Sequence, residues 1–213
     1  GVASHCTGPG PRFAVAVGDA GTVLVGATVD DWKIVATPTD RRLEAVALSD
    51  GGLATAIGAQ GTILRSTDSG ASWTLRPSGT SADLLSISLQ QVRDPQTGND
   101  SIRGLITGAT GTLLYSEDGD VWQRVETGVT DDLRRQATAP FVDTRILGEG
   151  RLFRWTFGDT RPTLEHDLRR PLHDLVMFGA GGVTLPGEVL VVLGDGALHT
   201  YFSAGVCECE GHY

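Results

Sequence analysis

The chain has 213 residues, of which 29 are glycine, 6% are aromatic and the formal net charge is −9. A charge of this sign excludes a general binder of nucleic acids or anionic membranes, because attraction to phosphate requires clustered cations. No stretch approaches the roughly 20 consecutive apolar residues of a membrane-spanning helix. Abundant glycine favours short strands joined by tight turns, and a chain of this length can fold as a single all-β domain.

Residues 1–11 are predicted to form a leader, because proline and glycine interrupt regular structure before the first strand. The chain opens with glycine rather than methionine, so we expect an N-terminal signal segment to have been removed. The expected location is therefore secreted, periplasmic or on the cell surface.

The first clear pattern lies between residues 18 and 35, where a Gly-x-x-Gly-Thr turn precedes a short apolar strand and then a tryptophan. The second copy, residues 58–77, is the most complete. Its strand alternates apolar and polar residues, as a half-buried strand does. The turn that follows carries Ser66, Asp68, Gly70 and Trp73. Asp68 is expected to accept hydrogen bonds from nearby backbone N–H groups, and Gly70 can adopt a positive φ without steric cost.

A third copy, residues 108–122, matches the second with a turn that is one residue shorter. Its corresponding residues are Ser116, Asp118, Gly119 and Trp122. Two later copies keep only a Gly-x-Gly turn and the following strand. The second glycine of each turn falls at residues 21, 61, 111, 150 and 196. A repeat of about 40–45 residues is typical of the four-stranded blades of a β-propeller.

The turn from Ser66 to Trp73 resembles the Asp-box (BNR) motif, S-x-D-x-G-x-[ST]-W. The larger unit resembles the repeat of photosystem II assembly factor (Ycf48-like) β-propellers, most clearly over residues 43–126. This resemblance implies a propeller scaffold, and it implies protein binding more than any particular chemistry. Turn stabilisation explains Asp68 and Asp118 better than catalysis does.

We therefore predict a single β-propeller over residues 1–213, with five four-stranded blades. The terminal segments 1–11 and 204–213 are expected to pair and close the ring. The first blade has no clear opening strand unless the N-terminal residues supply it. The expected blades cover residues 12–38, 43–77, 84–126, 133–165 and 172–203.

In a propeller, the connections between blades and the turns between second and third strands emerge together on the face around the channel. Three such connections contain an acidic residue followed by two arginines, and we expect these pairs to occupy equivalent places in the repeat. Guanidinium groups bind carboxylate, phosphate or sulfate, so these arginines are candidates for an anionic ligand or an acidic protein partner. Alternatively, each arginine pairs with its neighbouring aspartate. The candidates are Arg41, Arg42, Arg134, Arg135, Arg169 and Arg170.

The chain ends carry the only cysteines. Placement at both ends favours a disulfide between Cys6 and either Cys207 or Cys209, in an oxidising compartment. The remaining thiol leaves covalent assembly with another chain open. A metal site built from His5, Cys6, Cys207, Cys209 and His212 is the alternative, because these ligands suit zinc or copper(I).

The predicted function is a non-catalytic binding or assembly module, with no cofactor. The alternatives are a lectin that binds carbohydrate through tryptophan faces and a structural subunit of an extracellular assembly. A sialidase-like glycoside hydrolase is disfavoured, because such an enzyme needs a tyrosine nucleophile. Tyr115 and Tyr201 fall in third strands, away from the channel, and the third tyrosine, Tyr213, is the C-terminal residue.

Overall fold

The computed structural model describes residues 1–5, 13–27, 30–93, 100–138, 143–167, 172–178, 188–193 and 198–201. Within these residues the chain forms five antiparallel sheets, four with four strands and one with three. The described part contains no helix long and apolar enough to cross a membrane. The prediction of an all-β fold is confirmed.

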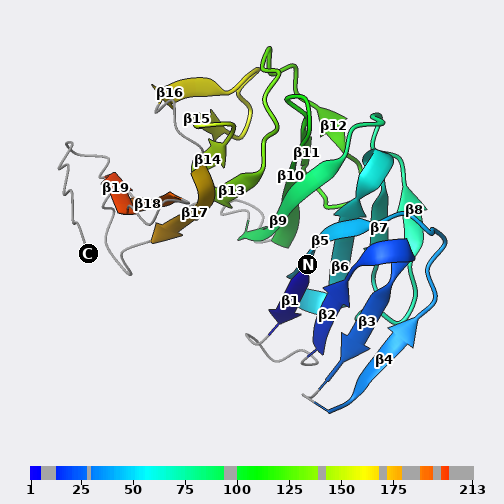
Figure 1. Cartoon of the computed structure of the whole chain (residues 1–213). Coiled ribbons are helices and arrows are strands. Elements are labelled where there is room, and N and C mark those ends of the chain that lie inside the picture. Colours follow the sequence, from blue (N-terminus) through cyan, green and yellow to red (C-terminus); the bar gives the residue numbers. More distant parts are fainter. Residues whose placement is uncertain are drawn as a thin grey trace.

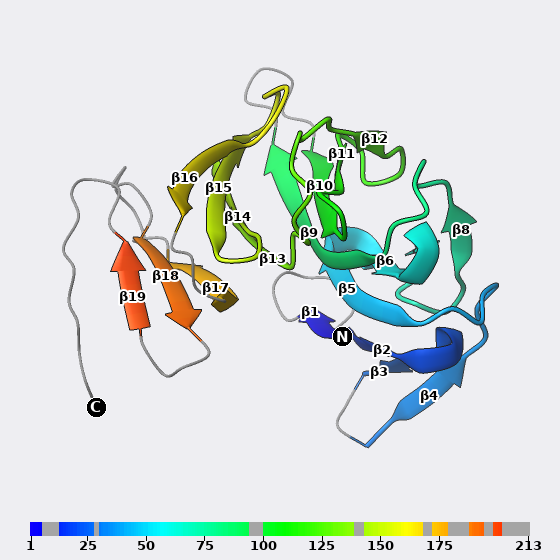
Figure 2. The same ribbon diagram turned by 45° about the horizontal axis from the view of Figure 1, so that its top comes forward.

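Strands that follow one another in the chain lie next to one another in each sheet. Figure 1 shows this simple order, and Figure 2 shows the sheets following one another along an arc. Three short 3₁₀ turns, η1 (Asp19–Gly21), η2 (Asp50–Gly52) and η3 (Ala59–Gly61), connect strands within the first two sheets. The first sheet consists of β1 (Val2–His5), β2 (Phe13–Val17), β3 (Val23–Gly26) and β4 (Trp32–Val35). The second consists of β5 (Leu43–Ser49), β6 (Leu53–Gly58), β7 (Ile63–Ser66) and β8 (Thr74–Arg76).

The third sheet has the longest strands, and the fifth has three strands. The third consists of β9 (Leu84–Arg93), β10 (Asp100–Gly108), β11 (Leu113–Ser116) and β12 (Gln123–Arg124). The fourth consists of β13 (Arg135–Thr138), β14 (Asp143–Leu147), β15 (Arg151–Thr156) and β16 (Thr163–Asp167). The fifth consists of β17 (Leu172–Phe178), β18 (Glu188–Leu193) and β19 (Leu198–Tyr201).

Apolar residues from neighbouring sheets pack face to face and form the core. Between the first two sheets, Val15 and Val23 pack with Leu64 and Trp73. Corresponding clusters join the second sheet to the third and the third to the fourth. Because successive strand residues point to opposite faces, the second and third sheets each bury one apolar set against each neighbour. Successive sheets therefore stack side by side, as the blades of a propeller do.

The first sheet obtains its opening strand from the N-terminal residues. Val2 lies opposite Ala16 and His5 lies opposite Phe13, so β1 pairs with β2 in the antiparallel sense. No described strand of the fifth sheet pairs with β1, and residues 204–213 lie outside the described residues. The expected closure of the ring by the two terminal segments stays a prediction, as does the number of blades in the complete ring.

Candidate functional site

The connections between successive sheets lie against the turns that join second and third strands. Three backbone hydrogen bonds repeat this contact, from Gly21 N to Arg41 O (2.9 Å), from Gly61 N to Ala82 O (2.8 Å) and from Gly111 N to Asp131 O (2.7 Å). We call the surface made by turns 18–22, 58–62 and 108–112 and by connections 37–42, 77–83 and 126–135 the turn–linker face. Its backbone is held by contacts that recur from sheet to sheet.

The second glycine of each turn is required by both conformation and space. Gly61 has a φ of +69°, and a Cβ there would lie 2.0 Å from Thr80 O. Gly21 and Gly111 show the same close approach of a linker carbonyl. A side chain at any of these positions would push the linker away from the turn. The Gly-x-x-Gly-Thr motif is thus what allows the turn–linker face to form.

Carboxylates bind two of the turns directly. Asp83 Oδ1 accepts a hydrogen bond from Gln60 N at 2.9 Å, and Asp132 Oδ1 accepts one from Thr110 N at 3.2 Å. Gln60 and Thr110 have φ values of 54° and 52°, a conformation that costs energy for residues other than glycine. These two carboxylates therefore hold the turns, which gives them a structural role.

The arginines of the turn–linker face do not occupy equivalent places, so this part of the sequence interpretation is wrong. Leu43 N donates to Gly18 O and Leu133 N donates to Gly108 O, each at 2.9 Å, which aligns the two leucines. Arg41 and Arg42 precede the first leucine, whereas Arg134 and Arg135 follow the second. The positions before Leu133 hold aspartates instead.

Each described arginine pair is exposed and already has partners. Arg42 pairs with Glu44, and Arg134 Nη2 lies 2.9 Å from Asp132 Oδ2. The side chains of Arg42 and Arg134 are still 54% and 53% exposed. Arg41 Nη1 donates to Gln60 O, and Arg135 Nη1 donates to Arg134 O. Arg169 and Arg170 lie outside the described residues.

The turn–linker face carries acids as well as arginines. Asp131 is buried and accepts a hydrogen bond from Arg151 Nε at 2.7 Å, with a second contact from Arg151 Nη2. Asp40 is exposed, and so is Glu149 in the turn after β14, whose Oε1 lies 3.8 Å from Arg134 Nη2 at the border of the face. The face is therefore one of mixed charge, in which arginines alternate with carboxylates.

The predicted Asp-box turn of the second sheet lies at the other end of the strands, next to η2. Asp68 accepts hydrogen bonds from Ser72 N (2.9 Å), Ser72 Oγ (2.6 Å) and Ser66 Oγ (2.7 Å). The bonds from Ser72 are the main cause that lowers the pKa of Asp68 to about 2. Gly70 packs against the preceding sheet, and Trp73 Nε1 donates to Gly70 O at 2.9 Å. The carboxylate therefore holds its own turn.

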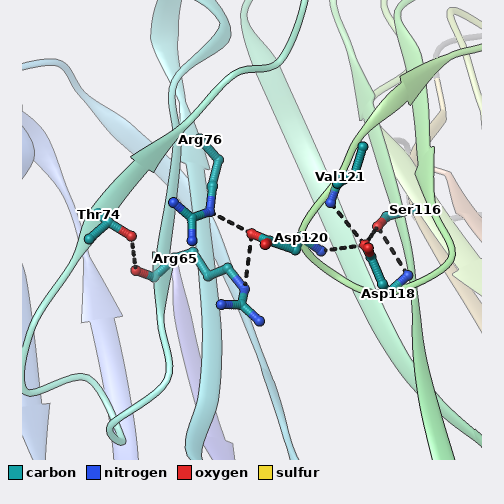
Figure 3. Close-up of polar contacts among 7 residues, drawn as sticks. All are labelled: Arg65, Thr74, Arg76, Ser116, Asp118, Asp120 and Val121. Carbon is teal, nitrogen blue, oxygen red and sulfur yellow. Dashed lines mark hydrogen bonds and ion pairs between the residues drawn. The ribbon is translucent and has the colours of Figure 1, made fainter.

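The corresponding turn of the third sheet keeps this arrangement in a shorter form. Asp118 Oδ1 accepts from Asp120 N, Val121 N and Ser116 Oγ at 2.8–2.9 Å (Figure 3). These hydrogen bonds outweigh partial burial and lower the pKa of Asp118. Gly119 contacts the second sheet, and Trp122 is buried, with no partner for its Nε1 atom in the described residues.

Burial of Trp73 and Trp122 also bears on the lectin alternative. Their side chains are 6% and 8% exposed, so their rings face the protein interior. Trp32, at 38% exposure, is the most exposed tryptophan of the described residues. A carbohydrate site built on the faces of Trp73 and Trp122 therefore has no accessible ring to use.

An ion cluster between the second and third sheets was not found from the sequence. Asp120 Oδ1 lies 2.5 Å from Arg76 Nε and 3.5 Å from Arg65 Nε (Figure 3). Asp120 occupies a variable position of the turn motif, and the arginines belong to a different repeat. In the sequence, the signal for this cluster is the alternation of the strand that contains Arg65, which places this residue on the face directed at the next sheet.

Of the five residues of the predicted terminal cluster, four lie outside the described residues: Cys6, Cys207, Cys209 and His212. His5 belongs to β1. The disulfide and the metal alternative therefore stay predictions. Elsewhere in the described part, no group of three or more His, Cys, Asp or Glu residues is placed to hold a metal ion.

Comparison with known proteins gives structural matches. No family model and no curated protein sequence matches the chain. The solved structure of YCF48 bound to D1 peptide matches with a TM-score of 0.68 and 16% identity, covering 92% of this chain and 61% of that chain. The chain has a YCF48-like propeller fold. YCF48 from Cyanidioschyzon merolae matches with a TM-score of 0.63 and 16% identity, covering 88% of this chain and 62% of the other. This chain thus spans about three fifths of the length of either YCF48 chain.

Proposed function

We propose that the chain is a non-catalytic protein-binding module that holds an acidic segment of a partner polypeptide on its turn–linker face. A structurally similar YCF48 is bound to a D1 peptide, which supports a polypeptide as the class of ligand. The observation that carries the proposal is the exposure of Arg42 and Arg134, each above one half despite an ion pair.

The existing ion pairs do not prevent binding. Exposed ion pairs contribute only about 0–1 kcal/mol, so a carboxylate of a partner can replace Glu44 or Asp132 at little cost. Guanidinium groups present a planar fork that fits a carboxylate. The repeated turn contacts hold the linker backbone in place, so little conformational freedom is lost on binding.

The acids of this face explain why an extended partner suits it better than a small reactant. Asp83 and Asp132 hold the turns, and Asp131 is paired with Arg151. Carboxylates with fixed partners are poorly placed to transfer protons. The proposed role is therefore binding without chemistry.

The test begins with the chain as bait in an extract of its native source, with mass spectrometry to identify the protein that co-purifies. Affinity for that purified partner is then measured by calorimetry for the wild type and for Arg42→Ala with Arg134→Ala. We expect at least about tenfold weaker binding and a smaller dependence of affinity on salt.

The matched control is Arg124→Ala. Arg124 lies on the outer strand β12, is also exposed, and also has an acidic neighbour, with its Nε 3.7 Å from Glu126 Oε1. This variant should bind as the wild type does. The proposal fails if the control and the double variant have the same affinity. It also fails if turnover of a glycoside reporter accompanies binding.

A further inference from the structure

Three successive interfaces between sheets can be compared position by position. Val25 lies opposite Val15, Arg65 opposite Thr55 and Tyr115 opposite Leu105, at the same place in their hairpins. Val25, Arg65 and Tyr115 are therefore equivalent positions of the third strands. Each side chain is directed at the following sheet.

Two of these interfaces are filled at this position. Between the second and third sheets, Arg65 and Arg76 share the carboxylate of Asp120 (Figure 3). Between the third and fourth sheets, the Tyr115 ring lies 6.1 Å from Trp155 and 5.5 Å from Phe157. Long side chains thus occupy the outer part of both interfaces.

The interface between the first and second sheets is open at the same position. The short side chains of Val25, Val35 and Ala71 stand where Arg65, Arg76 and Asp120 stand one interface later. A cavity of about 540 Å³ lies there, lined also by Phe13, Lys33 and Ser69. This volume is within the range of about 300–1,000 Å³ that is usual for binding pockets.

The cavity lies beside the free edge of a sheet. Strand β4 is the last of its sheet, and among the described strands it pairs only with β3. Its outer edge therefore offers backbone N–H and C=O groups to an added strand. Ile34 on β4 is 79% exposed, so an added strand would also cover an apolar side chain that the described residues leave uncovered.

The charges at the mouth define the occupant further. Lys33 Nζ lies 3.4 Å from Asp31 Oδ1, and the two side chains are 75% and 53% exposed. The rest of the lining is mainly apolar. A segment with an apolar side chain between an acidic and a basic residue matches both the lining and the mouth.

We propose that this cavity binds an apolar side chain of an extended partner segment, which adds to the free edge of β4 and pairs its own charges with Lys33 and Asp31. The site is separate from the turn–linker face and does not depend on the function proposed for that face. Because the cavity is lined by short side chains, a leucine or phenylalanine fits it better than an alanine.

Fluorescence anisotropy with synthetic peptides of the sequence Thr-Glu-Val-X-Val-Lys-Thr tests this. The variable residue X is leucine, phenylalanine or alanine. The leucine or phenylalanine peptide should bind at least about tenfold more tightly than the alanine peptide. Amides of β4 should become protected from hydrogen exchange on binding. Equal affinities, absence of binding up to about 1 mM, or protection elsewhere in the chain would overturn the proposal.

Variants locate the binding in the cavity. Val35→Arg with Ala71→Asp copies the Arg76–Asp120 pair of the next interface and should abolish the preference for a large X. Val25→Thr keeps the volume but replaces a methyl group by a hydroxyl, and it should weaken the preference for a large X at least about threefold. The matched control Leu75→Ala, on the outer strand of the second sheet, should leave it unchanged. A preference that survives both cavity variants would contradict the proposal.

A final comparison separates the two sites. Arg42→Ala with Arg134→Ala should bind these peptides with unchanged affinity, whatever its effect on the partner of the turn–linker face. Loss of peptide binding in that variant would show that the peptides bind the arginines instead of the cavity.

Discussion

Replacement of Gly61 by alanine tests the contact that builds the turn–linker face. A Cβ at Gly61 would lie 2.0 Å from Thr80 O, so the linker has to move away. The movement would break the hydrogen bond from Gly61 N to Ala82 O and the one from Ser78 Oγ to Thr80 O. Each bond contributes about 1 kcal/mol, and the positive φ adds about 1 kcal/mol. We expect a loss of about 3 kcal/mol in the free energy of unfolding.

Gly79→Ala is the matched control. Gly79 has nearly the same φ, +70°, but a Cβ there would meet nothing within 4 Å. Only the backbone term of about 1 kcal/mol applies. Urea denaturation of both variants should therefore differ by about 2 kcal/mol, with a larger fall in melting temperature for Gly61→Ala. Equal losses would refute the packing of linker on turn.

Three further predictions concern the outer turns. Trp73→Phe should lose about 1 kcal/mol more stability than Trp122→Phe in thermal unfolding, because only the first indole has a hydrogen-bond acceptor; equal losses would contradict this. The pKa of Asp68 is lowered from 3.8 to about 2, so its stabilisation is complete above about pH 4 and is lost as the pH falls towards 2. After allowance for its exposure, the carboxylate contributes about 1 kcal/mol to the free energy of unfolding. Melting curves between pH 2 and 6 should show the loss in the wild type but not in Asp68→Asn. Asp120→Ala should lose about 1–2 kcal/mol in urea denaturation, because two arginines are left without their shared carboxylate; a loss no greater than that of Arg124→Ala would count against the cluster.

The repeats were readable from the sequence because their signals are local. A Gly-x-x-Gly-Thr turn and the alternating strand that follows it are determined by a few adjacent residues. Ser72 lies four residues after Asp68, so the hydrogen bond from its backbone N–H to the Asp68 carboxylate could be expected from residue type alone, whereas the bonds from the serine hydroxyls were not. The four strands of the second sheet, from Leu43 to Arg76, accordingly fall within the expected blade of residues 43–77.

Contacts between sheets could not be read in the same way. Both arginine pairs of the linkers follow an acidic residue, a pattern that predicts equivalent places. Their register is set instead by where Leu43 and Leu133 contact the preceding turn. Likewise, the contents of each interface depend on which strand residues meet across it. Val25, Arg65 and Tyr115 share a position in the repeat but no chemistry. The cavity between the first two sheets therefore has no signature within a single repeat.

A photo-crosslinking amino acid on each side of the molecule tests the proposed binding face most directly. One variant carries it in place of Asp40, an exposed residue of the turn–linker face, and the other in place of Thr67, an exposed residue of the Asp-box turn. Each variant is irradiated with the partner purified from the native source, and adducts are resolved by mass spectrometry. The account predicts a single adduct from position 40 and none from position 67. Adducts from position 67 alone, or equally from both positions, would contradict it.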